Sequence, residues 1–383
     1  MPKARAWLEI DLGAIIKNAR ALVQQAAPAS LCAVVKSNGY GHGMGPVARA
    51  LQEADIAGLR FGVFDLSEAT LLRDAGISAP IIVLGPIEET EIDDAATLTL
   101  EVALLDDRLC EAFAGHRVAA HVKVDTGLNR FGIARQRAAA ALQRCRELGV
   151  NIAGIYSHLA NAEDLDKEFT LEQVERLRRV AVEFTRPSQA RANLTDAKDP
   201  TPVLHIAASA AAMMWPQTRL DMVRCGIALY GAWPSPEVHA FMAGEAPSFE
   251  LAPALRWFAP IVQVRDVRSG ETVGYGRAFT ARRDSRIAML PLGYSDGFPR
   301  AAGMGKARVR VKSANSHSIH APIVGRVCMN VCMLDVTELA PQPTVGDIVE
   351  LDVDDIARAA GTINYEILAA LPAHLERRYR ETP

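Results

Sequence analysis

The sequence predicts an α/β protein in which a (β/α)8 barrel of the TIM type, residues 1–245, is followed by a mostly-β domain, residues 246–383. A chain of 383 residues has the length of two domains, or of one large barrel with an appendage. Up to about residue 235, short apolar runs rich in β-branched residues alternate with longer segments of helical period. After residue 250 the segments are short, strand-like and separated by Gly, Pro, Asp or Ser. Residues 1–10 are a candidate for pairing with the β domain.

Eight apolar runs are the expected barrel strands: Leu31–Val35, Phe61–Phe64, Ile81–Leu84, Thr97–Leu104, Ala119–Val124, Ile152–Ser157, Val203–His205 and Asp221–Val223. Segments of helical period lie between them, and these are Leu12–Ala27, Gly45–Ala54, Leu66–Asp74, Gln136–Leu148 and Leu171–Phe184. The strand runs are continuously apolar, as in a parallel sheet that is covered on both faces. Eight strand–helix units in this length favour a closed barrel over an open doubly wound sheet.

The last third of the chain predicts a separate β domain. Its candidate strands are Ala254–Val267, Arg286–Leu292, Ala307–Val311, Ile323–Val327, Cys332–Val336 and Asp347–Leu351. No helix of length is expected among them before Asn364–Leu371. The stretch Trp233–Phe249, which contains three prolines and a glycine, is the expected junction.

Composition argues against several classes of function. The 42 basic and 45 acidic side chains leave a net charge of −3, which gives no electrostatic basis for binding nucleic acid or an anionic membrane. No run approaches the roughly 18 apolar residues of a membrane span. Glu9 and Asp11 stand where a secretory signal would be apolar, so we expect a cytoplasmic protein.

The six cysteines are scattered along a long chain, so we expect them to be reduced and mostly buried. Cys328 and Cys332 are four residues apart, but no second pair of Cys or His with ligand spacing lies beside them. We therefore expect no metal site.

The strongest local motif is AVVKSNGYGHG at residues 33–43. Lys36 ends a buried strand, where loss of hydration disfavours the ammonium form and lowers the pKa of the amine. A neutral amine can form a Schiff base with an aldehyde. The glycine-rich loop that follows opens a helix near Gly45, and its backbone amides could hold an anion. The alternative is a strand lysine that extends to solvent before an ordinary loop.

This motif is similar to the cofactor-lysine motif of the bacterial alanine racemases, which use pyridoxal 5′-phosphate. The resemblance continues in the family's order through VKVDTGLNRFG (122–132), GIYSHLANAED (154–164), HIAASAA (205–211), MVRCGIALYG (222–231), VGYGRAF (273–279), LGYSDGFPR (292–300), GRVCMN (325–330) and TINYE (362–366). It spans nearly the whole chain, and so many matches in one order are highly specific together. The family fold is a barrel followed by a β domain, which agrees with the fold predicted from the pattern.

The resemblance implies a homodimeric enzyme that interconverts L- and D-alanine with two bases on opposite faces of the α-carbon. Lys36 matches the lysine that binds the cofactor and moves the proton on one face. Tyr275 matches the second base, which would come from the other subunit. A free phenol with a pKa of about 10 is a poor base at neutral pH, so it needs help. His158 and Arg224 match the residues that provide this help.

A charged guanidinium at Arg224 also implies that the ring nitrogen of the cofactor stays unprotonated. That arrangement stabilises the carbanion less, and it suppresses side reactions such as transamination. The family's phosphate-binding residues match Tyr40, Ser209, Gly226, Ile227 and Tyr365.

Further matches concern the substrate. Arg130 matches an arginine that contacts the phenolic oxygen of the cofactor and the carboxylate of the substrate. Because Lys123 would place a second cation nearby, we expect it to carry a carbamate, as the matching lysine does in many family members. Met329 and Tyr294 match residues at the substrate side and at the entrance. The expected partners are alanine and a second copy of the chain.

Considered alone, each of these side chains has a structural alternative. Tyr275 could pack in the β domain, and His158 could be a satisfied core histidine. Arg224 could pair with a carboxylate, and Ser209 could be a helix N-cap.

Two departures from the family pattern leave the amino-acid preference open. Ala208 stands where many relatives have asparagine, and Asn330 stands where an aspartate is usual. A serine or broad-specificity racemase of the same fold is therefore an alternative. A related decarboxylase would place a carboxylate where this chain has Arg224, and a single-barrel cofactor carrier would lack Tyr275. The product would supply peptidoglycan synthesis or arise in alanine catabolism.

Overall fold

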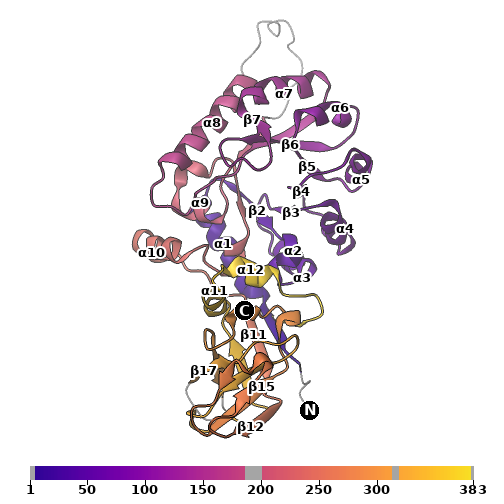
Figure 1. The fold of residues 1–383 in the computed structure, drawn as a ribbon. Coiled ribbons are helices and arrows are strands. Elements are labelled where there is room, and N and C mark those ends of the chain that lie inside the picture. The colour runs from indigo at the N-terminus through magenta and orange to yellow at the C-terminus, as the bar shows by residue number, and fades with distance from the viewer. Residues whose placement is uncertain (1–4, 186–200, 313–318, 381–383) are drawn as a thin grey trace, which may run out of the picture. The chain divides into compact units, whose positions relative to one another are not determined.

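The computed structural model describes residues 5–185, 201–312 and 319–380, and the chain divides into two compact units (Figure 1). The barrel unit comprises Ala14–Gly39 and Met44–Ala252. The β unit comprises Met1–Gly13, Tyr40–Gly43 and Pro253–Pro383. The β unit therefore combines segments that are far apart in the sequence.

The barrel unit is a closed ring of eight parallel strands, which confirms the predicted fold class. The strands are β2 (Ser30–Val34), β3 (Arg60–Val63), β4 (Ile81–Val83), β5 (Glu101–Leu104), β6 (Ala119–Asp125), β8 (Asn151–Tyr156), β9 (Val203–His205) and β10 (Met222–Cys225). They hydrogen-bond in the order β5-β4-β3-β2-β10-β9-β8-β6, and β5 pairs with β6 to close the ring. The short strand β7 (Ile133–Ala134) pairs in parallel with the last two residues of β6.

Helices alternate with these strands, and Figure 1 shows α3 to α8 outside the ring. They are α1 (Leu12–Ala26), α2 (Lys36–Tyr40), α3 (Met44–Glu53), α4 (Leu66–Asp74), α5 (Ile92–Thr97), α6 (Cys110–Phe113), α7 (Arg135–Glu147), α8 (Glu168–Thr185), α9 (Ser209–Met214) and α10 (Pro236–Glu245). Apolar side chains of one helix face, such as Val47 and Leu51 of α3, are fully buried. Each such side chain contributes roughly 1.5–3 kcal/mol when it leaves water.

Two expectations for the barrel unit were wrong. The run Thr97–Leu104 is a strand only over Glu101–Leu104, because Thr97 ends α5 and Thr99 turns the chain with a φ of 52°. Not all cysteines are reduced, since Cys110 and Cys145 form a disulfide with their Cα atoms 5.1 Å apart. Cys110 on α6 and Cys145 on α7 are both fully buried, so the packing of these two helices brings the thiols together.

The β unit is built on a nine-stranded sheet in the order β12-β15-β18-β17-β16-β19-β11-β1-β20. Its strands are β1 (Trp7–Asp11), β11 (Leu255–Pro260), β12 (Gln263–Val267), β15 (Ser285–Leu290), β16 (Arg308–Lys312), β17 (Ile319–Val324), β18 (Cys332–Asp335), β19 (Ile348–Leu351) and β20 (Glu376–Arg380). The N-terminal strand β1 pairs antiparallel with β11 and parallel with β20. A separate hairpin joins β13 (Thr272–Val273) and β14 (Phe279–Thr280).

The β unit differs from the sequence expectation in two places. The run Ala254–Val267 forms two strands, β11 and β12, which lie in different parts of the sheet. A helix of 8 residues, α11 (Val353–Ala360), precedes α12 (Asn364–Ala369), where no helix of length was expected. Asp352 caps α11 by accepting from the amide of Asp355 at 2.9 Å, and Gly361 ends it in the left-handed conformation.

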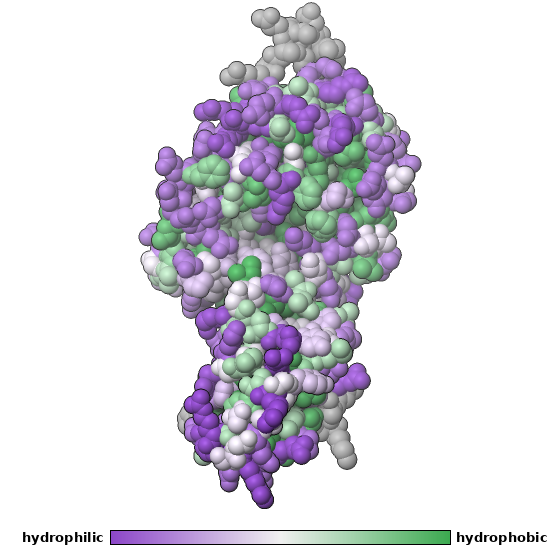
Figure 2. Space-filling view, viewed as in Figure 1, coloured by the Kyte–Doolittle hydropathy of each residue, from purple (hydrophilic) through white to green (hydrophobic). Residues whose placement is uncertain are grey.

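The surface of the barrel region carries hydrophilic side chains over its helices, with hydrophobic ones visible between them (Figure 2). In the described part of the chain, no helix has both the length and the apolar character needed to span a membrane.

Candidate active site

Lys36 follows the carboxyl end of β2, the place where barrel proteins carry their chemistry. Its side chain is half-buried, and the amine lies 5.8 Å from the centre of the Phe64 ring. Burial lowers the pKa of the Lys36 amine, and the charge of Arg130 lowers it further, against an opposing effect of Glu68. The amine is therefore more readily neutral than an exposed lysine.

The backbone after Lys36 turns through left-handed conformations. Ser37, Asn38 and Gly39 have φ values of 54°, 53° and 62°. Asn38 Oδ1 accepts from the amide of Met44 at 3.1 Å and so caps α3. Glu68 accepts from the amides of Ser37 at 2.6 Å and Phe64 at 2.8 Å, which ties together the ends of β2 and β3.

The glycines at the end of this motif are required by close backbone approaches within the β unit. Gly43 has a φ of 98°, and a Cβ there would collide with the hydroxyl of Tyr379. That hydroxyl donates to the carbonyl of His42 at 3.2 Å. Gly41 has a φ of 78°, and its carbonyl accepts from Arg377 Nε at 2.8 Å. Residues 40–43 are thus fixed by contacts rather than left as an open loop.

Arg224 on β10 is buried, and its contacts orient it completely. Its Nη1 donates to His205 Nδ1 at 2.7 Å, and its Nη2 donates to the carbonyls of Ser157 at 2.8 Å and Ile206 at 3.2 Å. Nη2 also lies 3.2 Å from His158 Nδ1. In the described part of the chain these partners are imidazole nitrogens and carbonyl oxygens, and the expected alternative, a carboxylate, is not among them.

His158 is held as a neutral imidazole. A guanidinium can only donate, so the Nδ1 that faces Arg224 is an acceptor and the ring proton is on Nε2. Burial lowers the pKa of His158 well below its ordinary value, and the charges of Arg224 and Arg130 add to this effect.

Ser209, Gly226 and Ile227 are brought together by the barrel. Ser209 begins α9, but Ala208 occupies the N-cap position, so Ser209 does not cap its own helix. Its Oγ accepts instead from the amides of Gly226 at 3.1 Å and Ala228 at 3.5 Å. Ile227 lies between these two amides at the start of a short 3-10 turn, Ile227–Tyr230.

Lys123 on β6 is buried, with its amine 5.5 Å from the centre of the Tyr156 ring and 5.7 Å from that of Phe131. Burial lowers the pKa of Lys123 to about 8, and the charges of Arg224 and Arg130 contribute. Arg130 itself is exposed in a loop that Asp125 shapes by accepting from the amide of Gly127 at 2.8 Å.

The remaining candidates lie in the β unit. Tyr275 is 72% exposed, in a short turn between Gly274 and Gly276, so it is not a packing residue within this chain. Tyr294 and Met329 lie in adjacent loops, because the amides of Tyr294 and Ser295 donate to the carbonyls of Cys328 and Met329 at 3.1 and 3.0 Å.

Tyr40 and Tyr365 also come together in the β unit, with ring centres 6.3 Å apart. They are 325 positions apart in sequence numbering (365 minus 40), and both were predicted to bind phosphate. In the described residues, no group of three or more His, Cys, Asp or Glu side chains is arranged to hold a metal ion.

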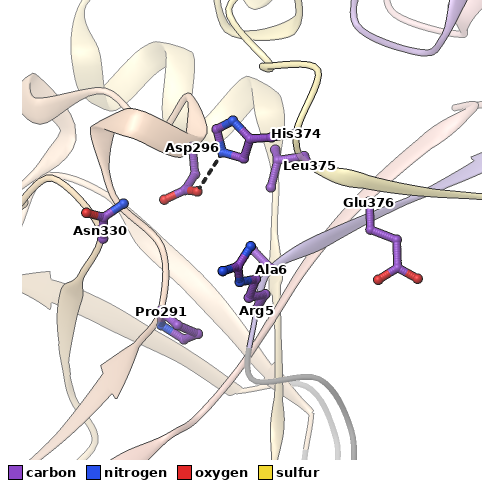
Figure 3. A pocket seen from close by; sticks show the side chains of 8 residues that line it. All are labelled: Arg5, Ala6, Pro291, Asp296, Asn330, His374, Leu375 and Glu376. Carbon is purple, nitrogen blue, oxygen red and sulfur yellow. Dashed lines mark hydrogen bonds and ion pairs between the residues drawn. The ribbon is translucent and has the colours of Figure 1, made fainter.

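The β unit also contains a cavity of about 740 Å³ that none of the predicted site residues lines (Figure 3). Its walls include Arg5, Asn330 and a hydrogen-bonded pair in which Asp296 Oδ1 lies 3.2 Å from His374 Nε2. Asn330, one of the two departures, donates to Ser295 Oγ at 2.6 Å.

Sequence reasoning quoted His205 within a motif but gave it no role. The structure makes it the partner of Arg224, fully buried, with its ring stacked on Tyr156 at 4.8 Å between ring centres. The available signal was a histidine at the end of an apolar strand, since a buried imidazole needs hydrogen-bond partners.

The fold and this geometry define a two-domain barrel enzyme whose polar residues gather at the carboxyl ends of the strands. The chain matches the family model of the alanine racemase N-terminal domain over residues 10–234 and that of the alanine racemase C-terminal domain over residues 254–379. The chain belongs to the alanine racemase family, whose members are isomerases.

Individual proteins agree with this assignment. The alanine racemase of Desulforamulus reducens is 37% identical over 98% of this chain and 99% of its own length. That of Methanococcus maripaludis is 34% identical over 97% and 98%. The alanine racemase of Bartonella henselae, solved with covalently bound pyridoxal phosphate, is 29% identical with a TM-score of 0.84, covering 98% of this chain and all of that one.

Proposed function

We propose that this protein is a pyridoxal-phosphate-dependent alanine racemase that interconverts L- and D-alanine with two bases, across a homodimer interface. The observation that carries the proposal is the pairing of two strand ends. Lys36, an amine with a lowered pKa, follows β2, and β2 pairs with β10, on which the buried Arg224 lies opposite Cys32. The related protein of Bartonella henselae holds its cofactor covalently, which an amine of this kind supports.

The donors of the barrel unit fit this cofactor. A readily neutral amine suits an aldehyde, and a hydroxyl with neighbouring amides suits a phosphate. Both contacts of Ser209 use its oxygen as the acceptor, so its hydrogen can be donated to a phosphate oxygen. Gly226 and Ile227 would add backbone donors. The family resemblance also assigns phosphate binding to the phenol hydroxyls of Tyr40 and Tyr365, which belong to the β unit. Arg224, permanently charged, would face the ring nitrogen.

When bound, the cofactor would withdraw electrons from the α-carbon of the amino acid. Lys36 would then remove or return the α-proton on one face of that carbon. Its lowered pKa makes the amine a base at pH values where an ordinary lysine is charged. Tyr275 would serve the opposite face as the phenolate.

His158 supports this role of Tyr275. Its Nδ1 is engaged with Arg224, so the ring presents Nε2–H, a donor that stabilises a phenolate oxygen. Neutral His158 adds no positive charge of its own. It would therefore stabilise the phenolate by a directed hydrogen bond, and Arg224 would hold the imidazole in place. Tyr275, His158 and Arg224 would therefore act together as one hydrogen-bonded series.

Substrate recognition is assigned to Arg130, whose exposed guanidinium can bind a carboxylate. Met329 and Tyr294, on their adjacent loops, would lie at the substrate side and the entrance. The alanine racemase of Bacillus anthracis, 28% identical with a TM-score of 0.84 over the whole of this chain and 97% of that one, was solved with bound L-Ala-P. An amino-acid substrate is in keeping with that relative.

Lys123 is proposed to carry a carbamate. A neutral amine adds to carbon dioxide, forms the N–C bond and releases one proton, so the group changes from a cation to an anion. A pKa of about 8 leaves an appreciable neutral fraction at neutral pH. The anion would also offset the charges of Arg224 and Arg130, which disfavour a second cation there.

The exposure of Tyr275, 72% in a single chain, supports a homodimer in which this side chain would act in the site of a second copy. The proposal places the enzyme in the cytoplasm, where its product would supply peptidoglycan synthesis or enter alanine catabolism.

The test is an exchange experiment on the purified protein with pyridoxal 5′-phosphate and L-alanine in D2O. Proton NMR should show loss of the α-hydrogen, and a D-amino-acid oxidase assay should show D-alanine. Lys36→Ala should abolish both signals. A protein that binds the cofactor but exchanges no α-hydrogen would be a carrier instead. Comparison of kcat/KM for alanine and serine separates the broad-specificity alternative.

A further inference from the structure

A hydrogen-bonded chain runs from Arg224 into the barrel wall, through residues to which sequence reasoning gave no role. His205 Nε2 lies 2.9 Å from His121 Nδ1, and His121 Nε2 lies 2.8 Å from Glu101 Oε2. Arg60 Nε pairs with the two oxygens of Glu101 at 3.4 and 3.3 Å. His205, His121, Glu101 and Arg60 come from four different strands, β9, β6, β5 and β3.

Arg224, which can only donate, and Glu101, which accepts, fix the direction of the bonds from the two ends of this chain. A guanidinium only donates, so His205 Nδ1 accepts and the ring proton is on Nε2. That proton faces His121 Nδ1, which must accept in turn, and this places the proton of His121 on Nε2. His121 Nε2–H then requires an acceptor, and Glu101 is the acceptor it has.

We propose that Glu101 is a positioning residue for Arg224, acting through His121 and His205. This inference rests on the proposed function, in which Arg224 faces the cofactor and supports His158. Glu101 ends the chain with an acceptor, so Nη1 of Arg224 stays bonded to His205 and Nη2 stays directed at His158. A buried chain with an unmatched donor would instead leave the guanidinium free to reorient.

The barrel is shaped around this chain. Gly154 of β8 is paired with His121, and a Cβ at Gly154 would collide with the His121 imidazole. Tyr156 stacks on His205 with an angle of 1° between the rings, and the guanidinium carbon of Arg224 lies 5.2 Å from the centre of the same ring. Space and stacking thus hold His121, His205 and Arg224 in their places.

The protonation states of Glu101 and His205 agree with hydrogen bonds that all point from Arg224 toward Glu101. Burial raises the pKa of Glu101, but its contacts with His121 and Arg60 outweigh this, so the pKa is lowered and the carboxylate is ionised. Burial lowers the pKa of His205 well below its ordinary value, and the charge of Arg224 lowers it further. Glu101 is therefore an acceptor, and His205 is neutral.

The first test is nitrogen-15 NMR of the cofactor-free protein labelled at histidine. His121 and His205 should both show the neutral Nε2–H tautomer at pH 7. Glu101→Gln keeps an acceptor oxygen and should retain this signature, whereas Glu101→Leu should lose it for His121. An Nδ1–H tautomer or an imidazolium at His205 in the unmodified protein would overturn the inference.

The second test is the kinetics of the cofactor-loaded variants. Glu101→Leu removes the charged acceptor of the His121 Nε2–H, so kcat of this variant should fall about tenfold or more. KM for alanine should change by less than about twofold, since Glu101 acts through Arg224 and not on substrate binding. Glu101→Gln should recover most of kcat.

Gly154→Ala gives an independent route to the same result. It changes none of the residues of the hydrogen-bonded chain but displaces the His121 ring, so kcat should fall as in Glu101→Leu. Glu350→Gln is the matched control, because Glu350 also pairs with an arginine, Arg256, at 2.8 Å, in the β unit. That variant should keep the kcat of the unmodified protein.

A failure of the proposed function and a failure of the positioning role of Glu101 give different results. If the unmodified protein does not racemise alanine, the proposed function is wrong. The tautomers of His121 and His205 in the cofactor-free protein still show whether the hydrogen-bonded chain has the inferred direction. If it racemises alanine and both Glu101→Leu and Gly154→Ala keep full kcat, the positioning role of Glu101 is wrong. If Glu101→Leu does not fold, Gly154→Ala and Glu101→Gln carry the comparison.

Discussion

Arg224 Nη2 lies 3.2 Å from His158 Nδ1, and this contact decides which nitrogen of His158 carries the proton. Because the guanidinium is a donor only, the imidazole presents Nε2–H on its other side. One buried arginine thereby sets the chemical character of a neighbouring side chain as well as its position.

Substitution of Arg224 by lysine should be severe despite the retained charge. A single ammonium cannot contact His205, His158 and two carbonyls at once, so buried acceptors lose their partner. We expect kcat to fall by a factor of about ten to a hundred, and the free energy of unfolding to fall by about 2–4 kcal/mol. Steady-state kinetics and urea unfolding of the cofactor-free protein measure the two effects. An unchanged kcat would show that the simultaneous contacts of the guanidinium with His205 and His158 are not needed for the reaction.

Tyr275→Phe should separate the two faces of the reaction. With one base removed, α-hydrogen exchange should persist from one enantiomer of alanine and fall by about 10²–10⁴-fold from the other. Exchange in D2O, followed by proton NMR for each enantiomer separately, gives both rates. Equal residual rates from L- and D-alanine would contradict a two-base assignment.

Mixing variants tests whether Tyr275 acts in the other subunit. Lys36→Ala and Tyr275→Ala subunits are each expected to be inactive alone. Heterodimers should contain one site with both bases intact and recover part of the activity. The measurement is racemase activity of heterodimers purified with two different tags, and full inactivity there would place the two bases in the same chain.

Gly43→Ala should destabilise the protein through a specific collision. The φ of 98° alone costs an alanine roughly 1–2 kcal/mol, and the new Cβ would also meet the Tyr379 hydroxyl. Gly76→Ala is the control, since Gly76 has a φ of 83° but open space around it. Chemical unfolding should show a larger loss for Gly43→Ala than for Gly76→Ala. Equal losses would mean that Tyr379 gives way without penalty.

Stability should fall on the acid side because His158 and His205 are held neutral. Their pKa values in the native state lie well below the 6.5 expected of an unfolded histidine. As the pH falls through 6.5, the unfolded chain therefore binds protons that the native protein does not, and unfolding becomes more favourable. Each histidine contributes a slope of up to about 1.4 kcal/mol per pH unit.

The measurement is the free energy of unfolding of the cofactor-free protein between pH 5 and pH 7, by urea titration. His205→Gln should flatten the slope, and His239→Gln, at an exposed position, is the comparison. A slope that is the same in all three proteins would show that His205 does not remain neutral.

Local patterns were sufficient for the barrel, because its strands are continuous apolar runs that a covered parallel sheet requires. They failed at α11, where the capping residues Asp352 and Gly361 stand in the sequence but the helix has only two turns. They failed also for Cys110 and Cys145, which meet only because α6 packs on α7.

The roles of the site residues rest on the family resemblance and stay predictions. The sequence alone does not show which strands lie next to each other in the sheet. The contact of Arg224 with His205 follows from the pairing of β10 with β9, and that of His121 with His205 from the pairing of β8 with both β6 and β9. Such contacts depend on register, which no run of residues displays by itself.

The position of β1 has a consequence for how this protein is made. Its neighbours β11 and β20 begin at residues 255 and 376, so a growing chain must emerge almost whole before this first strand acquires its second partner. Until β20 is synthesised, one edge of β1 lacks its parallel partner. Cutting the gene near codon 250 would therefore not yield two independent domains. It would leave β1 on one fragment and the other strands of its sheet on the other.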